Sequence, residues 1–194
     1  MRILPRNYIG YKGVNSFFTG MTVGAVFTIY AALDPSIFSL GGIVLAVGML
    51  VIAKFYETIL NLRAFYRISL LVEWVMLGLV ALYLFRPYAF STALLVYAGY
   101  QVTFMFGAYL VRAETLFLNR KRILSWLDMA KQTGYLAGML VSWLFYKMLV
   151  WGWHIEDHAR QVYYLHWLLL VTEILILRLL VRSFEKVEQR ATTR

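Results

Sequence analysis

The stretch SIFSLGGIVLAVGMLVIA (residues 36–53) contains no charged residue and is followed directly by Lys54. The hydrocarbon core of a bilayer is about 30 Å thick, and an α-helix needs about 20 residues to cross it. A helix formed by this stretch has no charged face to turn toward water. The stretch therefore predicts a transmembrane helix, and it sets the class of the whole chain.

Further apolar runs lie on both sides of this stretch, separated by clusters of charge. The predicted spans cover residues 13–33, 36–53, 68–85, 88–111, 132–149 and 162–181. The polar, basic segment 112–131 between the fourth and fifth spans has loosely helical apolar spacing, which predicts an amphipathic helix lying in the interface. We therefore expect an all-α, polytopic transmembrane bundle of about six spans that forms a single domain over residues 1–194.

Composition supports a membrane protein and excludes several kinds of chemistry. The chain has 194 residues, of which 61% are hydrophobic and 15% are charged, whereas a soluble domain of this size needs a more charged surface. The net charge of +9 comes from basic residues that flank the apolar runs, so we expect anionic lipid as a partner and no nucleic acid. Cysteine is absent, which excludes disulfides and cysteine metal sites.

The distribution of Lys and Arg predicts the orientation. These residues occur at the N-terminus, in the second-to-third and fourth-to-fifth connections, and from Arg178 to the C-terminus, whereas the opposite side carries Arg86, Lys147 and Arg160. Basic residues favour the cytoplasmic side of a membrane. We therefore predict an integral protein of a bacterial inner membrane with both termini in the cytoplasm. Arg120, Lys121 and Arg122 form its basic cytoplasmic loop.

Glycine pairs predict which helices pack closely. Gly20 and Gly24 lie one turn apart in the first span, and Gly134 and Gly138 do so in the fifth. Small residues allow the backbones of membrane helices to approach each other. The second and fourth spans also carry several glycines, whereas the third and sixth have few. We therefore expect the first, second, fourth and fifth helices to pack together and the third and sixth to lie further out.

The order of these features matches a known transporter architecture. A very short turn, Leu33-Asp34-Pro35-Ser36, joins two glycine-bearing spans, and the basic segment Asn119–Ser125 leads into the glycine-rich segment Gly134–Gly138. In this order the chain resembles one six-helix half of the major facilitator superfamily. The resemblance implies a helical bundle in which the first and fourth helices line a central cavity.

The chain departs from that family at its most diagnostic motif. The motif has Gly, then Asp-Arg, then Gly-Arg-Arg between the second and third helices, and it would fall on residues 57–67. Asn61 stands at the acidic position and Ala64 at the second glycine, while Arg63 and Arg67 keep the basic character. A full transporter of this family has twelve helices. The resemblance therefore implies either a dimer or a fold kept without the transport cycle.

Ionisable residues inside predicted spans are the candidate functional groups. Glu73 lies in the third span, and Glu173 and Arg178 lie in the sixth. A charge at the centre of a bilayer costs roughly 2.5–3.5 kcal/mol on insertion scales, so each of these residues needs an explanation. The two acids could carry protons or bind a cationic substrate. Alternatively, each could pair with a base such as Arg67 or Arg178, or reach toward water.

Motifs for other chemistry are sparse. His154 and His158 stand four residues apart, but Ile155 occupies the position that Glu takes in zinc proteases, so we expect a solvated polar loop and no metal. Nucleotide-binding glycine loops and nucleophile elbows are absent from the sequence. We therefore expect no cofactor and no enzymatic activity, and an intramembrane enzyme is the least favoured function.

The sequence leaves two main functions open. The first is a non-catalytic membrane subunit that docks in, or helps to assemble, a larger membrane protein complex. The second is a half-size, major-facilitator-like transporter that works with a second copy of itself. The transporter hypothesis predicts a polar, uncharged cavity between the first and fourth helices. The candidate lining residues are Asn15, Ser16, Thr19, Thr22, Thr28, Tyr30, Tyr97, Tyr100, Gln101 and Thr103.

Overall fold

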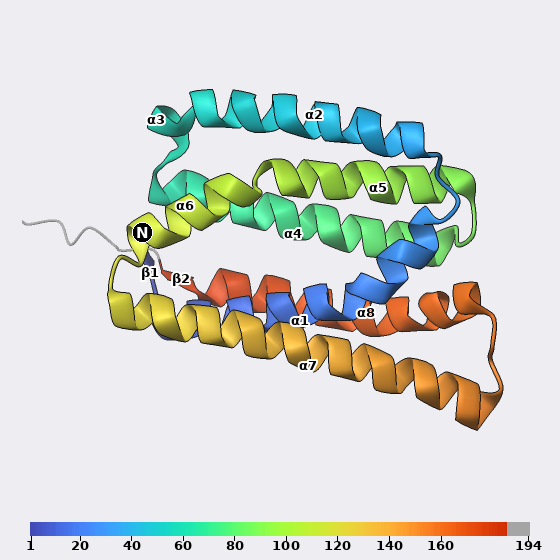
Figure 1. The fold of residues 1–194 in the computed structure, drawn as a ribbon. Coiled ribbons are helices and arrows are strands. Elements are labelled where there is room, and N and C mark those ends of the chain that lie inside the picture. The colour runs from blue at the N-terminus through green and yellow to red at the C-terminus, as the bar shows by residue number, and fades with distance from the viewer. Residues whose placement is uncertain (186–194) are drawn as a thin grey trace, which may run out of the picture.

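The computed structural model describes residues 1–185, and these residues fold almost entirely into helices (Figure 1). The elements are β1 (Arg2–Ile3), α1 (Pro5–Tyr30), α2 (Pro35–Lys54), α3 (Tyr56–Ile59), α4 (Leu62–Phe85), α5 (Phe90–Met105), α6 (Gly107–Phe117), α7 (Lys121–Trp153), α8 (His158–Arg182) and β2 (Phe184–Glu185). The prediction of an all-α fold is confirmed, apart from one short pair of strands.

Five helical segments are long and apolar enough to cross a membrane: α2, α4, α5 with α6, α7 and α8. The clearest case is α2, which has a mean hydropathy of 2.4 yet buries no residue within the described part of the chain. Contact of this apolar surface with water would be unfavourable, whereas contact with lipid chains is not. The chain is therefore an integral membrane protein.

The first helix differs from these five. It has 26 residues but is not among the segments whose composition alone fits a membrane span. Polar residues such as Asn15, Thr19 and Thr22 lower its hydropathy, and they line a groove between helices, in which Thr22 is buried and Thr19 is exposed. The prediction that α1 forms a sixth span therefore stays a prediction. A helix with these polar groups can cross a membrane when the other helices shelter them from lipid.

The helices form two layers (Figure 1). One layer contains α2, α4, α5 and α6, and the other contains α7 and α8. The first helix packs along both α7 and α8, and its C-terminal part crosses diagonally toward the other layer, where it contacts α5. The two layers also meet directly through α4 and α8, where the rings of Tyr83 and His166 stack at 4.0 Å. α1 therefore contacts helices of both layers.

The two ends of the described chain are joined. β1 and β2 pair in antiparallel register, with Arg2 opposite Glu185 and Ile3 opposite Phe184. The Arg2 guanidinium forms an ion pair with the Glu185 carboxylate at 2.7 Å, and Leu4 N donates to Ser183 O at 2.9 Å. The start of α1 and the end of α8 therefore lie at the same end of the bundle. The last three basic residues of the predicted C-terminal cluster lie outside the described residues.

Close backbone contact between α1 and α7 depends on glycine. A Cβ atom added at Gly134 would overlap the carbonyl oxygen of Gly13, and one added at Gly138 would overlap that of Phe17. A Cβ atom added at Gly20 would likewise overlap the carbonyl oxygen of Tyr135. One added at Gly24 would lie at ordinary contact distance from the Tyr146 ring. Small residues at these positions let the two backbones touch along several turns.

The predicted ranking of inner and outer helices is wrong. The third and sixth predicted spans correspond to α4 and α8, and both carry buried residues along their length, whereas the glycine-rich α2 carries none among the residues described. Glycine indicates where two backbones can approach, but it does not indicate which helix lies inside. Larger side chains such as Leu165, Leu169 and Ile176 fill the interior from α8.

The segment 112–131 is not a separate interfacial helix. Its first part completes α6, which reaches Phe117, and its second part forms the opening turns of α7 from Lys121. Good helix formers without proline or glycine between 121 and 133 allow α7 to continue into the apolar run. The third predicted span also begins earlier, because the Asn61 side chain caps α4 by accepting hydrogen bonds from Arg63 N and Ala64 N.

Substitution of Gly138 tests the contact between α1 and α7. We expect Gly138→Ala to lower the free energy of unfolding by about 2 kcal/mol, because the new methyl group overlaps a backbone carbonyl that cannot rotate away. Gly42→Ala is the matched control, since an added Cβ there meets no atom within 4 Å. Denaturant titration in mixed micelles measures both variants. Equal free energies of unfolding for the Gly138→Ala and Gly42→Ala variants would contradict the proposed role of the close contact.

Candidate functional site

One face of α1 carries a row of polar side chains. Tyr8 and Lys12 are four residues apart, and so are Tyr11 and Asn15, so the two pairs lie on the same side of the helix. Each of them reaches a carboxylate that belongs to a different helix, either α4 or α6. We call these four residues the polar face of α1.

The first carboxylate is that of Glu114 on α6, and its charge is compensated. Tyr8 Oη donates to it at 3.0 Å, and Lys12 Nζ lies 3.4 Å away. Lys131 Nζ from α7 forms a second ion pair and hydrogen bond with it. The Glu114 side chain is almost completely buried, so these partners replace the water that it loses. This cluster ties α6 and α7 to the N-terminal half of α1.

The second carboxylate is that of Glu73, near the middle of α4, and it is held by neutral donors. Tyr11 Oη donates to it at 2.5 Å, and Asn15 Nδ2 lies 3.1 and 3.3 Å from its two oxygens. Neither Arg67 nor any other base within residues 1–185 forms an ion pair with it. Glu73 therefore has hydrogen bonds but no countercharge at ion-pair distance.

The third carboxylate is that of Glu173 on α8, and it has no hydrogen-bond donor. Its side chain is 0% exposed, and neither oxygen receives a donor from the part of the chain described. Glu173 and Glu73 line the same groove between the helices. A buried acceptor without a partner costs about 1–3 kcal/mol, and more if it is charged. This pair of carboxyl groups is the least compensated polar site among the described residues.

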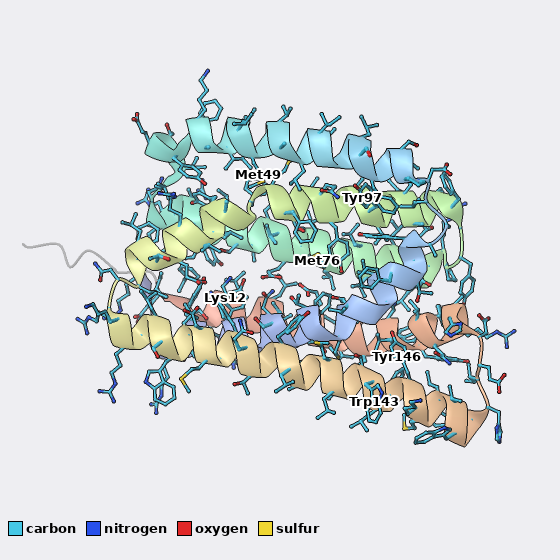
Figure 2. All side chains as sticks on the ribbon, in the orientation of Figure 1. Lys12, Met49, Met76, Tyr97, Trp143 and Tyr146 are labelled. Atoms are coloured by element: carbon cyan, nitrogen blue, oxygen red, sulfur yellow. The ribbon has the colours of Figure 1, made fainter. Side chains whose placement is uncertain are left out.

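A groove leads to the carboxyl pair. It has a volume of about 390 Å³ and lies between α1, α4, α5 and α8. Figure 2 shows Met76, which lines this groove, on α4 between the two layers, and Lys12 lies between the layers closer to the end that carries the chain terminus. Most of the wall is apolar, with hydroxyl groups from three threonines. Its polar lining residues include Thr19, Thr22, Thr103, Glu73 and Glu173.

The structure brings some predicted site residues together and separates others. Glu73 and Glu173 meet in the groove, but Arg178 is exposed and forms no ion pair within residues 1–185. The predicted basic loop is exposed, with Arg120 directly before α7 and Lys121 and Arg122 in its first turn. Six of the predicted cavity residues line the groove: Asn15, Thr19, Thr22, Tyr30, Tyr100 and Thr103.

Sequence reasoning missed Glu114 and its two lysine partners. Glu114 was grouped with a basic interfacial segment, and Lys12 and Lys131 were counted only as flanking charges. The spacing of polar residues along the N-terminal half of α1 was the available signal, because a single helix face that carries Tyr8, Lys12 and Asn15 must meet polar partners inside a bundle. The partners themselves could not be found from spacing alone.

The histidine loop has a structural role. His154 ends α7 in the left-handed backbone conformation with φ 54°, and the Asp157 side chain caps α8 by accepting from Ala159 N. No group of three His, Cys, Asp or Glu side chains within residues 1–185 is arranged to hold a metal ion. Comparison with protein-family models, with curated proteins and with solved structures gives no match for this chain.

Removal of one lysine tests the Glu114 cluster. We expect Lys131→Met to lower the free energy of unfolding by about 2 kcal/mol, because a buried carboxylate loses one of its two countercharges. Lys121→Met, an exposed lysine at the start of the same helix, is the control and should change it by less than about 0.5 kcal/mol. Adding Glu114→Gln to Lys131→Met should recover part of the loss. Strictly additive effects in this double-mutant cycle would show that the two groups are not coupled.

Proposed function

We propose that this chain is one half of a membrane transporter and that it works as a dimer with its groove at the interface. The observation that carries this proposal is the groove with two carboxyl groups inside it. Carboxyl groups at mid-helix in a membrane protein are costly, and they commonly mark paths for ions or substrates. The uncharged cavity expected for such a transporter is therefore replaced by one that contains acids.

A second copy is the cover that this groove needs. Phe27 and Phe104 line the groove and are 74% and 54% exposed, so the groove opens along the side of the bundle. In a lone chain this opening would place polar groups such as Thr19 beside lipid. A symmetric pair of identical chains would close both grooves with one interface. The resemblance to half of a major facilitator transporter is in agreement with this arrangement.

The proposed orientation places the basic end in the cytoplasm of a bacterial inner membrane. The N-terminal segment, the start of α4 and the connection between α6 and α7 line a common hollow, so their basic residues share one end of the bundle. The paired strands add the end of α8 to the same group. With α1 as a sixth span, both termini would then lie on the side that the positive-inside rule favours.

A second candidate function is a non-catalytic subunit of a larger membrane complex. The exposed groove mouth favours it as well, because a different membrane protein could supply the cover instead of a second copy. In both cases we expect no enzymatic activity and no cofactor. The two candidates differ in what lies across the groove from Phe27 and Phe104.

Cysteine cross-linking identifies what lies across the groove. The chain has no cysteine, so Phe27→Cys and Phe104→Cys each introduce a single thiol at the groove mouth. We expect mild oxidation in native membranes to give a covalent homodimer for at least one of these two variants. The control is Val47→Cys, which lies on the exposed surface of α2 and should remain monomeric.

The mass of the gently solubilised protein completes this test. A mass of two identical chains, together with groove-specific cross-links, supports the transporter half. Stoichiometric co-purification of other membrane proteins without a homodimer overturns it in favour of the complex subunit. Equal cross-linking of Val47→Cys and the groove variants would indicate random collision, and it would also contradict the proposed interface.

A further inference from the structure

We infer that the groove is a binding site for a lipophilic organic cation with a single positive charge, which is neutralised by the carboxyl pair of Glu73 and Glu173. This inference rests on the proposed function and names the class of substrate for it. It follows from three properties of the groove: its uncompensated acid, its pattern of hydrogen-bond donors, and its apolar wall. Each of these properties narrows the chemistry of the ligand.

The acid determines the sign of the ligand's charge. Glu173 is completely buried in the wall of the groove, and none of the described residues donates a hydrogen bond to it. The nearest ammonium on the polar face, Lys12, is engaged by Glu114 at 3.4 Å. A ligand in the groove therefore lies beside a buried carboxyl group that has no hydrogen-bond partner among the described residues. A cation supplies that partner, whereas an anion would be repelled.

The pairing of the two acids sets the amount of charge. Glu73 is already stabilised by donors from Tyr11 and Asn15, and it lines the same groove as Glu173. Two carboxyl groups buried in one groove do not readily ionise together, because like charges repel each other strongly away from water. They can share one proton and so carry a single negative charge. One positive charge on the ligand balances the pair.

The hydroxyl groups argue against a sugar or another neutral polyol. Thr19 Oγ1 donates to Asn15 O at 3.1 Å, and Thr22 Oγ1 donates to Thr19 O at 2.8 Å. Thr103 Oγ1 likewise donates to Tyr100 O at 2.8 Å. These three threonine hydroxyls are committed as donors to their own helix backbones, so the hydroxyl donors left for a ligand are those of Tyr30 and Tyr100 at the groove wall. The groove therefore suits a ligand that brings its own donors and positive charge.

The wall of the groove suits an organic rather than an inorganic cation. Its volume of about 390 Å³ is that of a small-molecule site and far exceeds one metal ion. Aromatic rings surround the space, and their faces attract cations while their area covers apolar groups. The aromatic lining residues are Phe18, Phe27, Tyr30, Tyr100 and Phe104. An inorganic cation would lose its water here without gaining enough oxygen ligands.

Ethidium, a planar aromatic cation with one charge, is the probe for this site. Its fluorescence anisotropy is titrated with the purified, detergent-solubilised full chain. We expect Glu173→Gln to raise the Kd for ethidium about tenfold or more, since the substitution keeps the shape and removes the charge. Glu173→Asp, which keeps the charge, should retain most of the affinity. The matched control is Glu156→Gln, an exposed acid in the loop before α8, and it should leave the Kd within about twofold.

A second variant, which blocks the groove sterically, tests whether a loss of ethidium binding comes from the groove and not from misfolding. Val23→Trp fills the groove from α1 without touching either acid's charge, and it should also weaken ethidium binding at least about tenfold. Circular dichroism and size-exclusion profiles like those of the unsubstituted chain establish that each variant is folded. Equal affinity of the unsubstituted chain, Glu173→Gln and Val23→Trp would overturn the inference, and so would the absence of saturable binding.

The same samples separate this inference from the proposed function. A groove-linked homodimer that does not bind ethidium would leave the transporter half standing and would overturn the cation site. Saturable binding that depends on Glu173, in a protein that forms no homodimer, would support the cation site and would remove the proposed dimeric transporter.

Discussion

The burial of three carboxyl groups beside one helix is the constraint on which this structure depends. Glu73, Glu114 and Glu173 come from α4, α6 and α8, and all three have lost their water. In a bundle surrounded by lipid, this loss must be compensated by neighbouring side chains. The polar face of α1 supplies that compensation for the first two acids, so the position of α1 between the layers follows from electrostatics as much as from packing.

The glycine contacts with α7 make this position possible. Because the backbones of α1 and α7 touch at Gly134 and Gly138, α7 occupies one side of α1 closely and needs no bulky side chains there. The opposite side of α1 is then free to turn its polar face toward the acids. At the N-terminal end this face is saturated by Glu114 and its lysine partners, whereas further along the helix it opens into the groove at Glu173. The same face of α1 thus contacts both Glu114, which has a structural role, and Glu73, which belongs to the candidate functional site.

Sequence alone predicted the membrane class, the approximate helices and the two acids of the groove, because length, apolarity and isolated charge are local properties. It could not predict which helices are neighbours, so it suggested Arg67 or Arg178 for Glu73 where the structure has Tyr11 and Asn15. The segment 112–131 was misassigned because its charges concealed a continuous helix. Glu114 was overlooked because its lysines are distant in sequence and become partners only when α1, α6 and α7 assemble.

The pairing of Arg2–Ile3 with Phe184–Glu185 has a consequence for biosynthesis. The ribosome releases β1 before α1 to α8 and β2 after them, so the two strands cannot pair while these helices are still being inserted. During that interval α1 must wait with Lys12 unpaired until Glu114 has emerged. The polar face of α1 therefore stays without its acidic partners until α4 and α6 have been synthesised.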